Sequence, residues 1–322
     1  MKILVTGGAG YIGSTISNYF LDKGHEVEII DNLSTGLVKN IPKKSVFYKI
    51  DISNVKKLDK ILKKKKFDIV FHLAALISNE ESIKYPKKYY YNNYLKSKIF
   101  LKQCIKNNIN NFVYSSTAAV YGNKDKPISE NDFLRPLSPY SKSKLRLENL
   151  FKKEKKKISC IILRYFNVAG SDLKLRCGFN IKKSHNLILN LCAASLKKKK
   201  FVINGDNYNT KDGTTIRDYI HVQDLAHIHL LAANLILKKK VFKILNCGYG
   251  QGFSIKEILT TFNSILKKDI EYRIGKERPR DIKISISNPN KLIKTIKWKP
   301  KYNDLSDLLN SSLRWYKKIS TV

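Results

Sequence analysis

Tyr140 and Lys144 form the first pair in this sequence whose types and spacing suggest chemistry. They lie in "SPYSKSK" (138–144). If this segment is helical, side chains four residues apart project from the same face, one turn apart. A positive charge favours the ionised form of a phenol, so a tyrosine beside an ammonium group can become a phenolate base. A surface Tyr–Lys pair is also common without any function, so other parts of the chain have to decide between the two interpretations.

Three glycines near the N-terminus predict a dinucleotide site. "VTGGAGYIGS" (5–14) contains Gly7, Gly10 and Gly13 between an apolar, strand-like run and a predicted helix, which is the context that the motif requires. Gly7 permits the tight turn, Gly10 lets the backbone approach a pyrophosphate, and Gly13 permits close helix–strand packing. The N-terminus of the helix then faces the anion.

Acidic residues end the next two predicted strands. Asp31 follows Gly13 by 18 residues, and no arginine comes soon after it. A carboxylate there accepts hydrogen bonds from ribose hydroxyls and repels a 2′-phosphate, which favours NAD over NADP. Asp51 either reaches the adenine or caps the following helix. "HLAA" (72–75) ends the fourth strand with small residues that suit a nearby cofactor, and His72 is expected to be a packed strand residue.

The elements that must position these residues alternate between strands and helices. Such alternation predicts an α/β fold, a Rossmann-type doubly wound parallel sheet with right-handed crossovers. Ligands bind at the carboxyl ends of such strands, so Thr117 should present its hydroxyl near the nicotinamide, beside Tyr140 and Lys144. The expected strands are 2–7, 26–30, 46–50, 68–74, 111–116 and 159–166, and the expected helices are 11–23, 54–64, 88–107 and 141–156.

The pattern changes after about residue 170, where loops lengthen and turn residues gather. Helices are expected near 186–197, 222–236 and 254–267. We interpret residues 1–170 as an NAD-binding domain and residues 171–322 as a smaller α/β substrate lobe over the carboxyl edge of the sheet. Segments around 215–250 are expected to return to the first domain.

The composition is that of an ordinary globular protein, with 322 residues, 43% hydrophobic and 27% charged. The sequence has no apolar run long enough for a membrane span, and we expect no signal peptide, because "MKILVTGG" leads directly into a strand-like apolar run. Five scattered cysteines without a CxxC motif suggest neither a disulfide framework nor a zinc site. His227 and His229, two apart on a predicted helix, make a poor metal pair. We therefore expect a reduced, cytoplasmic protein without a metal.

A formal net charge of +36 is the unusual feature of the composition. The excess is lysine, in runs spread along the chain where helices are expected to end, and cations are favourable at helix C-termini. Abundant lysine, isoleucine and asparagine together indicate drift towards AT-rich codons. A dedicated polyanion-binding role is the alternative, and it requires one contiguous basic face. We expect neither a specific nucleic-acid partner nor a membrane partner.

The ordered set of motifs resembles the extended short-chain dehydrogenase/reductase superfamily and, more narrowly, its UDP-glucose 4-epimerase family. The resemblance runs nearly end to end. Each motif alone is shared more widely, but the ordered set is specific. The motifs are "VTGGAGYIGS", "DNLSTG", "YYNNY", "SSTAAVYG", "SPYSKSK", "LRYFNVAG", "DGTTIRDYIHVQDLA" and "LNCGYGQGFS".

The resemblance implies a reaction and a role for each catalytic residue. Tyr140 takes the proton from the 4-hydroxyl of a UDP-sugar, while hydride passes from C4 to NAD. The 4-keto sugar turns over, and hydride returns to its other face, which interconverts UDP-glucose and UDP-galactose. Thr117 hydrogen-bonds the reacting oxygen. Lys144 holds the nicotinamide ribose and, with the positive ring, lowers the pKa of Tyr140.

Further site residues and a homodimer, formed through segments 88–107 and 141–156, are also implied by the resemblance. Arg217 and Arg278 bind the substrate pyrophosphate, which suits the guanidinium fork. The implied cofactor contacts are Gly7, Gly10, Tyr11, Ile12, Gly13, Asp31, Asn32, Asp51, Ile52, Leu73, Ala74, Ala75, Asn93, Tyr140, Lys144 and Phe166. The implied substrate contacts are Thr117, Tyr140, Asn167, Asn186, Arg217, Arg278 and Ser285.

The sequence departs from the family pattern at four places. Ile77 replaces a frequent lysine, and Asn204 replaces an aromatic residue that stacks on uracil. "RPRD" replaces arginine-x-glycine-aspartate. Ser285 stands where a tyrosine limits the space around C2 of the sugar, which predicts tolerance of N-acetylated sugars. The alternative is that Ser285 is simply a strand residue and that the altered loop shifts the register.

Other enzymes on the same fold are the alternatives to this activity. A UDP-GlcNAc/GalNAc or UDP-pentose epimerase remains open, as does a decarboxylase, although the sequence offers no evident cation for a glucuronate. Dehydratases typically place Asp-Glu after the strand-end threonine, whereas Ala118 and Ala119 follow Thr117 here. Dehydration is therefore disfavoured.

Overall fold

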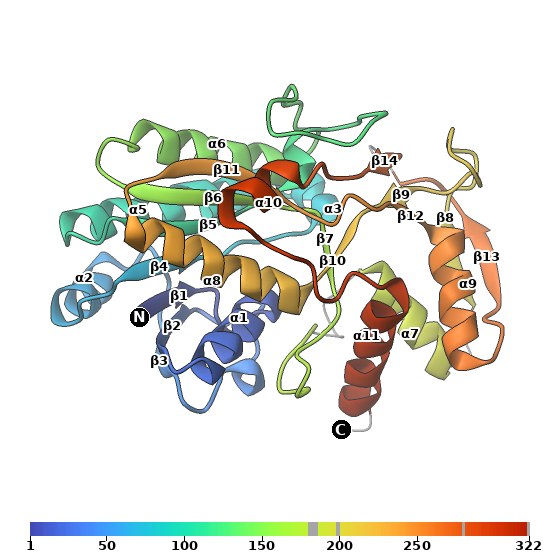
Figure 1. Cartoon of the computed structure of the whole chain (residues 1–322), viewed down its shortest axis with the longest axis horizontal. Coiled ribbons are helices and arrows are strands. Elements are labelled where there is room, and N and C mark those ends of the chain that lie inside the picture. Colours follow the sequence, from blue (N-terminus) through green and yellow to red (C-terminus); the bar gives the residue numbers. More distant parts are fainter. Residues whose placement is uncertain (180–185, 198–199, 279–280, 321–322) are drawn as a thin grey trace.

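The core of the structure is a parallel sheet whose carboxyl edge faces a second group of elements. This computed structural model describes residues 1–179, 186–197, 200–278 and 281–320 (Figure 1). Within them, seven strands hydrogen-bond in the order β11-β6-β5-β4-β1-β2-β3, and every pair is parallel. The expected doubly wound α/β fold is confirmed. The strands are β1 (Lys2–Thr6), β2 (Glu26–Asp31), β3 (Val46–Lys49), β4 (Ile69–His72), β5 (Asn111–Thr117), β6 (Ser159–Tyr165) and β11 (Phe242–Cys247).

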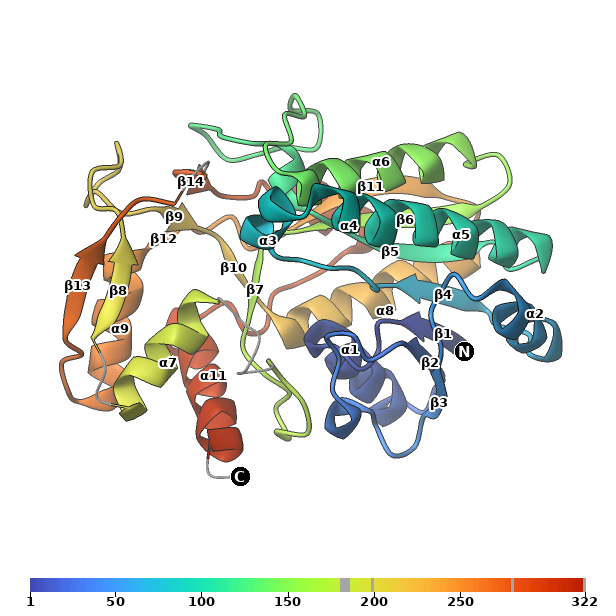
Figure 2. The same ribbon diagram turned by 180° about the vertical axis from the view of Figure 1, so that it is seen from behind.

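Helices cover both faces of this sheet (Figures 1 and 2). One face packs against α1 (Tyr11–Asp22), α8 (Val222–Lys238) and α10 (Asn290–Ile296), and the other against α2 (Val55–Lys64), α5 (Ser97–Lys106) and α6 (Pro139–Lys153). Because both faces are covered, the central strands are buried and mostly apolar, as β6 shows with all of its residues buried. The strand ends, and the loops that follow them, are therefore held on a rigid support.

Local signals in the sequence set the start of α6, the helix with the Tyr–Lys pair. The Ser138 side chain accepts a hydrogen bond from the Ser141 backbone N–H, and the Ser141 hydroxyl accepts one from the Ser138 backbone N–H. Pro139 occupies the first helical position. This capping box satisfies backbone donors that have no partner within the helix. It also fixes where the first turn, and with it Tyr140, lies against the sheet.

The segment expected as one helix over 88–107 is divided. It begins as the short helix α4 (Pro86–Tyr89), continues as a π-helical stretch at Tyr90–Lys96, and ends as α5. A wider π turn advances the following side chains around the helix axis, and such turns are frequent at functional sites. Lys96, at the end of this stretch, lies on the cavity wall described below. Periodicity in the sequence did not indicate the change in winding.

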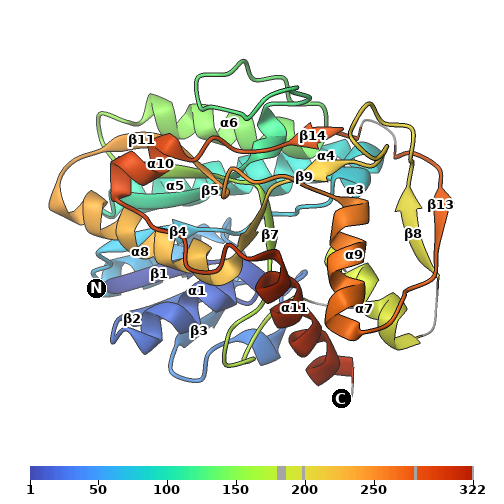
Figure 3. The same ribbon diagram turned by 45° about the vertical axis from the view of Figure 1, so that its right-hand side comes forward.

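The remaining elements form a smaller lobe with its own apolar core (Figure 3). Helices α7 (Leu187–Lys197), α9 (Ile255–Leu266) and α11 (Leu305–Ser320) pack beside the paired strands β8 (Phe201–Asn204) and β13 (Tyr272–Gly275). Small strands join this lobe to the rest: β7 (Asn167–Ala169) pairs with β10 (Tyr219–His221), and β9 (Ile216–Arg217) lies between β12 (Phe253–Ser254) and β14 (Ile284–Ser285). Outside this lobe, a further short helix, α3 (Asn79–Lys84), follows β4 of the large sheet.

Strand β11 is the part of the sheet that the sequence did not predict as a strand. It pairs in parallel with β6 over six residues, although about 75 residues separate the two in the chain. A short apolar run of this kind does not reveal which strand will pair with it. None of the helices in the described part of the chain has the length and apolar character that a membrane crossing requires.

Candidate active site

A cavity of about 530 Å³ lies at the carboxyl ends of the central strands. Its wall includes the glycine loop, the end of β2, the loop after β4, the end of β5 and the first turns of α6. Residues far apart in the sequence, such as Gly10, Thr117 and Asn186, are thus brought to one wall. The predicted site residues on the wall are Gly7, Gly10, Tyr11, Ile12, Gly13, Asp31, Asn32, Asp51, Ile52, Leu73, Ala74, Ala75, Thr117, Tyr140, Lys144, Phe166, Asn167 and Asn186.

The glycine loop has the backbone that the motif predicts. Gly7 has a φ of 75°, and a Cβ there would lie 2.8 Å from the backbone nitrogen of Ala74. A Cβ on Gly13 would lie 2.2 Å from the carbonyl oxygen of Gly7, so only glycine lets α1 start this close to β1. Gly10 is the N-cap residue of α1 and contributes no side-chain cap. The free N-terminus of the helix and the small wall at Ala74 fit a dinucleotide pyrophosphate.

Asp31 ends β2 as a buried carboxylate facing the cavity. It accepts hydrogen bonds from the backbone N–H groups of Ala9 (3.1 Å) and Leu33 (2.8 Å). Burial raises the pKa of Asp31, and the two backbone hydrogen bonds oppose that shift. A carboxylate held in this way has lone pairs left for two ribose hydroxyls, which agrees with the predicted preference for NAD.

Asp51 accepts several side-chain hydrogen bonds that the sequence did not predict. It accepts hydrogen bonds from Lys96 (2.6 Å), Asn32 (2.9 Å) and the hydroxyl of Ser53 (2.6 Å). Burial alone would raise the pKa of Asp51, but these hydrogen bonds lower it to about 2. The N-cap of α2 is Asn54, so Asp51 closes the turn before the helix and keeps Lys96 at the cavity wall.

Tyr140 and Thr117 meet on the cavity wall through their hydroxyl groups. The ring of Tyr140 packs edge-on against Tyr89, with centroids 6.4 Å apart. Burial raises the pKa of Tyr140 to about 12, and a hydrogen bond with the Thr117 hydroxyl opposes that rise. Thr117 also caps the following turn by accepting a hydrogen bond from the N–H of Ala119 (3.2 Å). The arrangement places a hydroxyl donor beside a phenol at the end of β5.

Lys144 lies one helical turn from Tyr140, as predicted, but it is itself strongly desolvated. Its Nζ is 3.5 Å from Ser115 Oγ and 4.9 Å above the ring of Tyr114. Burial lowers the pKa of Lys144 to about 7, while the carboxylate of Glu148 opposes that shift. In the protein without its cofactor, burial outweighs any effect of the Lys144 ammonium group on the pKa of Tyr140. The expected lowering, which also depends on the positive nicotinamide ring, stays a prediction.

A buried ion pair joins α6 to strand β6. Glu148, the next turn of α6 after Lys144, binds Arg164 of β6 through two hydrogen bonds of 3.0 and 2.6 Å, and it also accepts a short one from Ser116. Both side chains of the pair are 2% exposed. Three consecutive residues at the end of β5 thus contact three successive turns of α6: Thr117 with Tyr140, Ser116 with Glu148, and Ser115 with Lys144.

Two polar residues near the site have structural roles. His72 bonds Thr6 (2.8 Å) and Ser97 (2.9 Å), and burial lowers its pKa to about 3, so it is a neutral packed residue, as expected. Asn93 was expected at the cofactor but is not on the cavity wall. It is 1% exposed and bonds both the N–H and the carbonyl of Leu76. Asn93 therefore shapes the loop after β4.

The predicted substrate residues divide into two sets. Asn167 and Asn186 lie on the cavity wall, whereas Arg217, Arg278 and Ser285 lie outside it among the residues that the structure describes. Arg217 binds Asp281 (2.8 Å), and Arg278 lies 3.4 Å from Glu80 of α3.

Two of the departures from the family pattern can be located directly. Ile77 is 73% exposed on the wall, and Asn204 ends β8 outside it. Residues 279–280 of the "RPRD" loop lie outside the described part of the chain.

Two wall residues that sequence reasoning missed are Lys96 and Phe179. Lys96 follows the tyrosine- and asparagine-rich segment "YYNNY", but nothing in the sequence pairs it with Asp51. Phe179 stacks on Tyr11 with ring centroids 3.7 Å apart, across about 170 residues of chain. Neither contact has a local signal, because each depends on how distant segments cross.

Fold and site together define an NAD-binding enzyme of the short-chain dehydrogenase type, with the glycine loop, Asp31, and the Tyr140–Lys144 pair at one cavity. The model of the NAD dependent epimerase/dehydratase family matches residues 3–248. The chain belongs to this family, and its cofactor is NAD.

Similar proteins have the same length and fold. A UDP-glucose 4-epimerase from Lactobacillus helveticus is 37% identical over 98% of this chain and 97% of its own length. A UDP-glucose 4-epimerase structure from Stenotrophomonas maltophila, with bound NAD and formylated UDP-arabinopyranose, superimposes with a TM-score of 0.95 at 31% identity, covering 100% of this chain and 99% of that one. A UDP-Glc/GlcNAc 4-epimerase from Campylobacter jejuni superimposes with a TM-score of 0.84 at 36% identity, covering 98% and 99%.

Proposed function

We propose that this protein interconverts UDP-glucose and UDP-galactose by oxidation at C4, rotation of the 4-keto sugar and re-reduction. The observation that carries the proposal is the meeting of Thr117, Tyr140 and Lys144 on the wall that also holds the glycine loop and Asp31. Similarity to named UDP-glucose 4-epimerases over the full length supports it.

Proton transfer is the task of Tyr140. When bound, NAD would accept and return the hydride and, in its oxidised form, would supply a positive charge. Burial raises the pKa of Tyr140 to about 12 in the protein alone, so that positive charge is needed to favour the phenolate. Thr117 holds the sugar 4-oxygen beside the phenol by hydrogen bonding. Lys144, one turn away, binds the nicotinamide ribose and adds positive charge when it is protonated.

The sugar nucleotide is proposed to bind between the cavity and the smaller lobe. Asn167 and Asn186 provide amide groups at the wall, and Arg217 and Arg278 provide guanidinium groups beyond it. A firm grip on the diphosphate and a looser one on the hexose suit the reaction, because the sugar has to turn over between the two hydride transfers.

N-acetylated sugars are a second class of substrate that one feature favours. Ser285 pairs with Arg217 in the β14–β9 register and is 8% exposed. If this position faces C2 of the sugar, a serine leaves room for an acetamido group that a tyrosine would fill. The similar protein from Campylobacter jejuni is named a UDP-Glc/GlcNAc 4-epimerase, which supports the same extension here.

A homodimer and a cytoplasmic location complete the proposal. Exposed aromatic side chains lie on the π-helical stretch, within the segment 88–107 expected at the dimer contact: Tyr90 is 37% and Tyr91 55% exposed. Such a group of exposed side chains suits contact with a second copy. All five cysteines are buried and unpaired, which suits a reducing compartment.

Incubation with single UDP-sugars tests the activity. The purified protein should convert UDP-glucose to UDP-galactose, and the reverse, without added cofactor, with the products resolved by anion-exchange chromatography. UDP-GlcNAc and UDP-GalNAc form the second arm, and UDP-arabinose the third. If the protein holds NAD but converts neither the UDP-glucose/UDP-galactose pair nor the UDP-GlcNAc/UDP-GalNAc pair, the proposal is contradicted. If it converts only the N-acetyl pair, the second substrate class replaces the first.

A further inference from the structure

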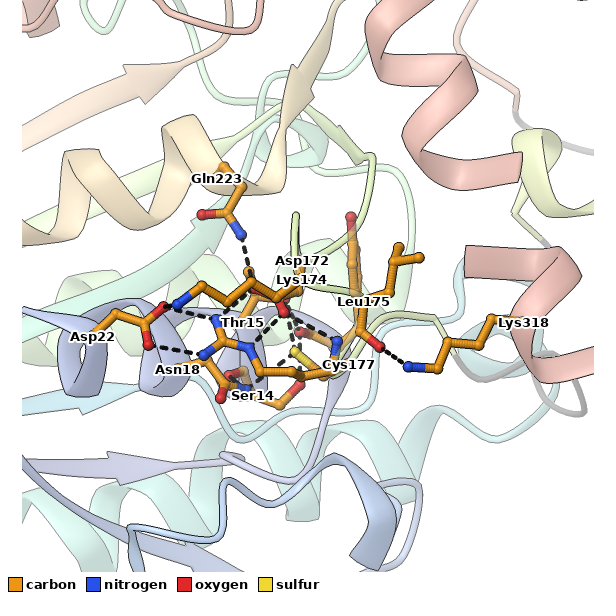
Figure 4. A network of polar contacts seen from close by, with 12 residues as sticks. Ser14, Thr15, Asn18, Asp22, Asp172, Lys174, Leu175, Cys177, Gln223 and Lys318 are labelled. Carbon is orange, nitrogen blue, oxygen red and sulfur yellow. Dashed lines mark hydrogen bonds and ion pairs between the residues drawn. The ribbon is translucent and has the colours of Figure 1, made fainter. Parts of the chain in front are cut away.

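Residues 170–179, which we call the strap, join the two parts of the molecule beside the cavity. The strap follows β7, and its beginning, middle and end each form a hydrogen bond with α11 of the smaller lobe. The N–H of Gly170 donates to Ser312 Oγ (3.0 Å), Lys318 Nζ donates to the carbonyl of Leu175 (2.8 Å), and Trp315 Nε1 donates to the carbonyl of Phe179 (3.0 Å). Figure 4 shows Lys318 on one side of the strap and the residues of α1 on the other.

Arg176 connects the strap to α1. Its guanidinium group makes two hydrogen bonds to Asp22 at the end of α1, both 2.9 Å, and two to Asp172 within the strap, of 2.7 and 2.8 Å. Asp172 is 1% exposed and also accepts from Gln223 of α8 (3.2 Å). Planar bidentate pairs of this kind fix orientation as well as distance. The strap is therefore held against α1 and α8 at a defined angle.

The final part of the strap reaches the cavity wall. Cys177 Sγ accepts from Asn18 of α1 (3.4 Å), and Phe179 stacks on Tyr11 with ring centroids 3.7 Å apart. The Tyr11 hydroxyl in turn donates to the carbonyl of Gly170 (2.7 Å), so the two ends of the strap meet at this ring. Tyr11 and Phe179 both line the cavity, next to Gly10.

We propose that the strap acts as a clasp that slows the release of NAD, and that Arg176 is the positioning residue that keeps Phe179 stacked on Tyr11. This inference rests on the proposed cofactor site. A cofactor leaving along this edge has to pass the Tyr11–Phe179 pair, which the Arg176 contacts hold closed. Slow release suits a reaction in which the same cofactor returns the hydride that it has accepted.

The rate of NAD loss from the holoenzyme tests the clasp. Protein purified with NAD(H) is mixed with charcoal, and the cofactor that remains bound is measured over time. Arg176→Ala and Phe179→Leu should each lose NAD at least about tenfold faster than wild type. Phe179→Leu keeps apolar volume and leaves the ion pairs intact, so it remains informative if Arg176→Ala folds poorly. Arg314→Ala, at an exposed position of α11, is the matched control and should lose NAD at the wild-type rate.

Two comparisons separate this role from alternatives. Arg176→Lys cannot bridge two carboxylates through a planar fork, so its release rate should lie between those of wild type and Arg176→Ala. If Arg176→Ala lowers the melting temperature but Arg176→Ala and Phe179→Leu both release NAD at the wild-type rate, the clasp is overturned. Arg176 would then only stabilise the fold. Gly10→Val tests the cofactor site itself. If it loses NAD while the strap variants retain it, the clasp alone is overturned, and if it retains NAD, the cofactor site is overturned and the clasp with it.

Discussion

The two halves of the site are built in different ways. The cofactor half consists of backbone and small side chains at the ends of one buried parallel sheet, where a Cβ at Gly13 would already collide with Gly7. The proposed sugar-nucleotide half consists of small two- and three-stranded sheets and of two arginines that already have acidic partners, Arg217 with Asp281 and Arg278 with Glu80. Dense packing resists deformation, whereas ion pairs can exchange one anion for another. We therefore expect changes in the first half to abolish function and changes in the second half to tune it.

Removing the phenol of Tyr140 should have the largest effect. Tyr140→Phe deletes the proton acceptor and almost no volume, so turnover should fall by roughly 10³-fold, within the range for loss of a general acid–base group. The NAD content of the purified protein should stay at the wild-type level, because the glycine loop and Asp31 are untouched. Near-normal turnover would remove Tyr140 from the role of base.

Breaking the buried pair behind α6 should cost the most stability. Glu148→Ala leaves Arg164 charged and 2% exposed without its partner, which should lower the free energy of unfolding by about 3–5 kcal/mol in urea denaturation. Glu154→Ala, at the end of the same helix and in a partly exposed pair with Lys157, should cost less than about 1 kcal/mol.

A double variant separates charge from packing at this position. Glu148→Leu with Arg164→Met removes both charges together and should regain much of the loss, because apolar replacements of buried pairs are often tolerated. Equal losses in Glu148→Ala and the double variant would show that packing, not charge pairing, stabilises this part of the protein.

Truncating Arg217 should act on the substrate and not on the cofactor. Charged hydrogen bonds contribute about 1.5–3 kcal/mol, so Arg217→Ala should lower kcat/KM by roughly 10- to 150-fold, mainly through KM. NAD content should not change. Arg273→Ala, on the exposed strand β13, serves as the matched control. A loss of NAD in Arg217→Ala would show that the two halves are not independent.

Enlarging Ser285 should have the smallest and most selective effect. Ser285→Tyr should reduce kcat/KM for UDP-GlcNAc about tenfold or more while changing that for UDP-glucose by less than about threefold, because the added ring competes only with the acetamido group. Ser285→Ala is the control for loss of the hydroxyl. If wild type ignores UDP-GlcNAc, or if Ser285→Tyr affects both sugars equally, Ser285 does not line the sugar pocket.

Much of the cofactor half could be predicted from the sequence because its signals are local. The Gly7–Gly13 spacing, a carboxylate at a strand end, and Tyr140 and Lys144 one turn apart each depend on a few neighbouring residues and on one periodicity. The strands β1 to β6 agree with the predicted ranges within about two residues at each end, since buried parallel strands appear as continuous apolar runs.

The sequence by itself thus determined the strand–helix order, the glycine turn and the face of α6 that carries Tyr140 and Lys144. Only the tertiary structure decided that β11 completes the sheet, that Lys96 binds Asp51, that Phe179 stacks on Tyr11, and that burial holds the pKa of Lys144 near 7. The physical reason is the same in each case. These properties arise where segments distant in the chain pack together, and the resulting contacts and loss of solvent depend on the whole fold and not on any local pattern of residues.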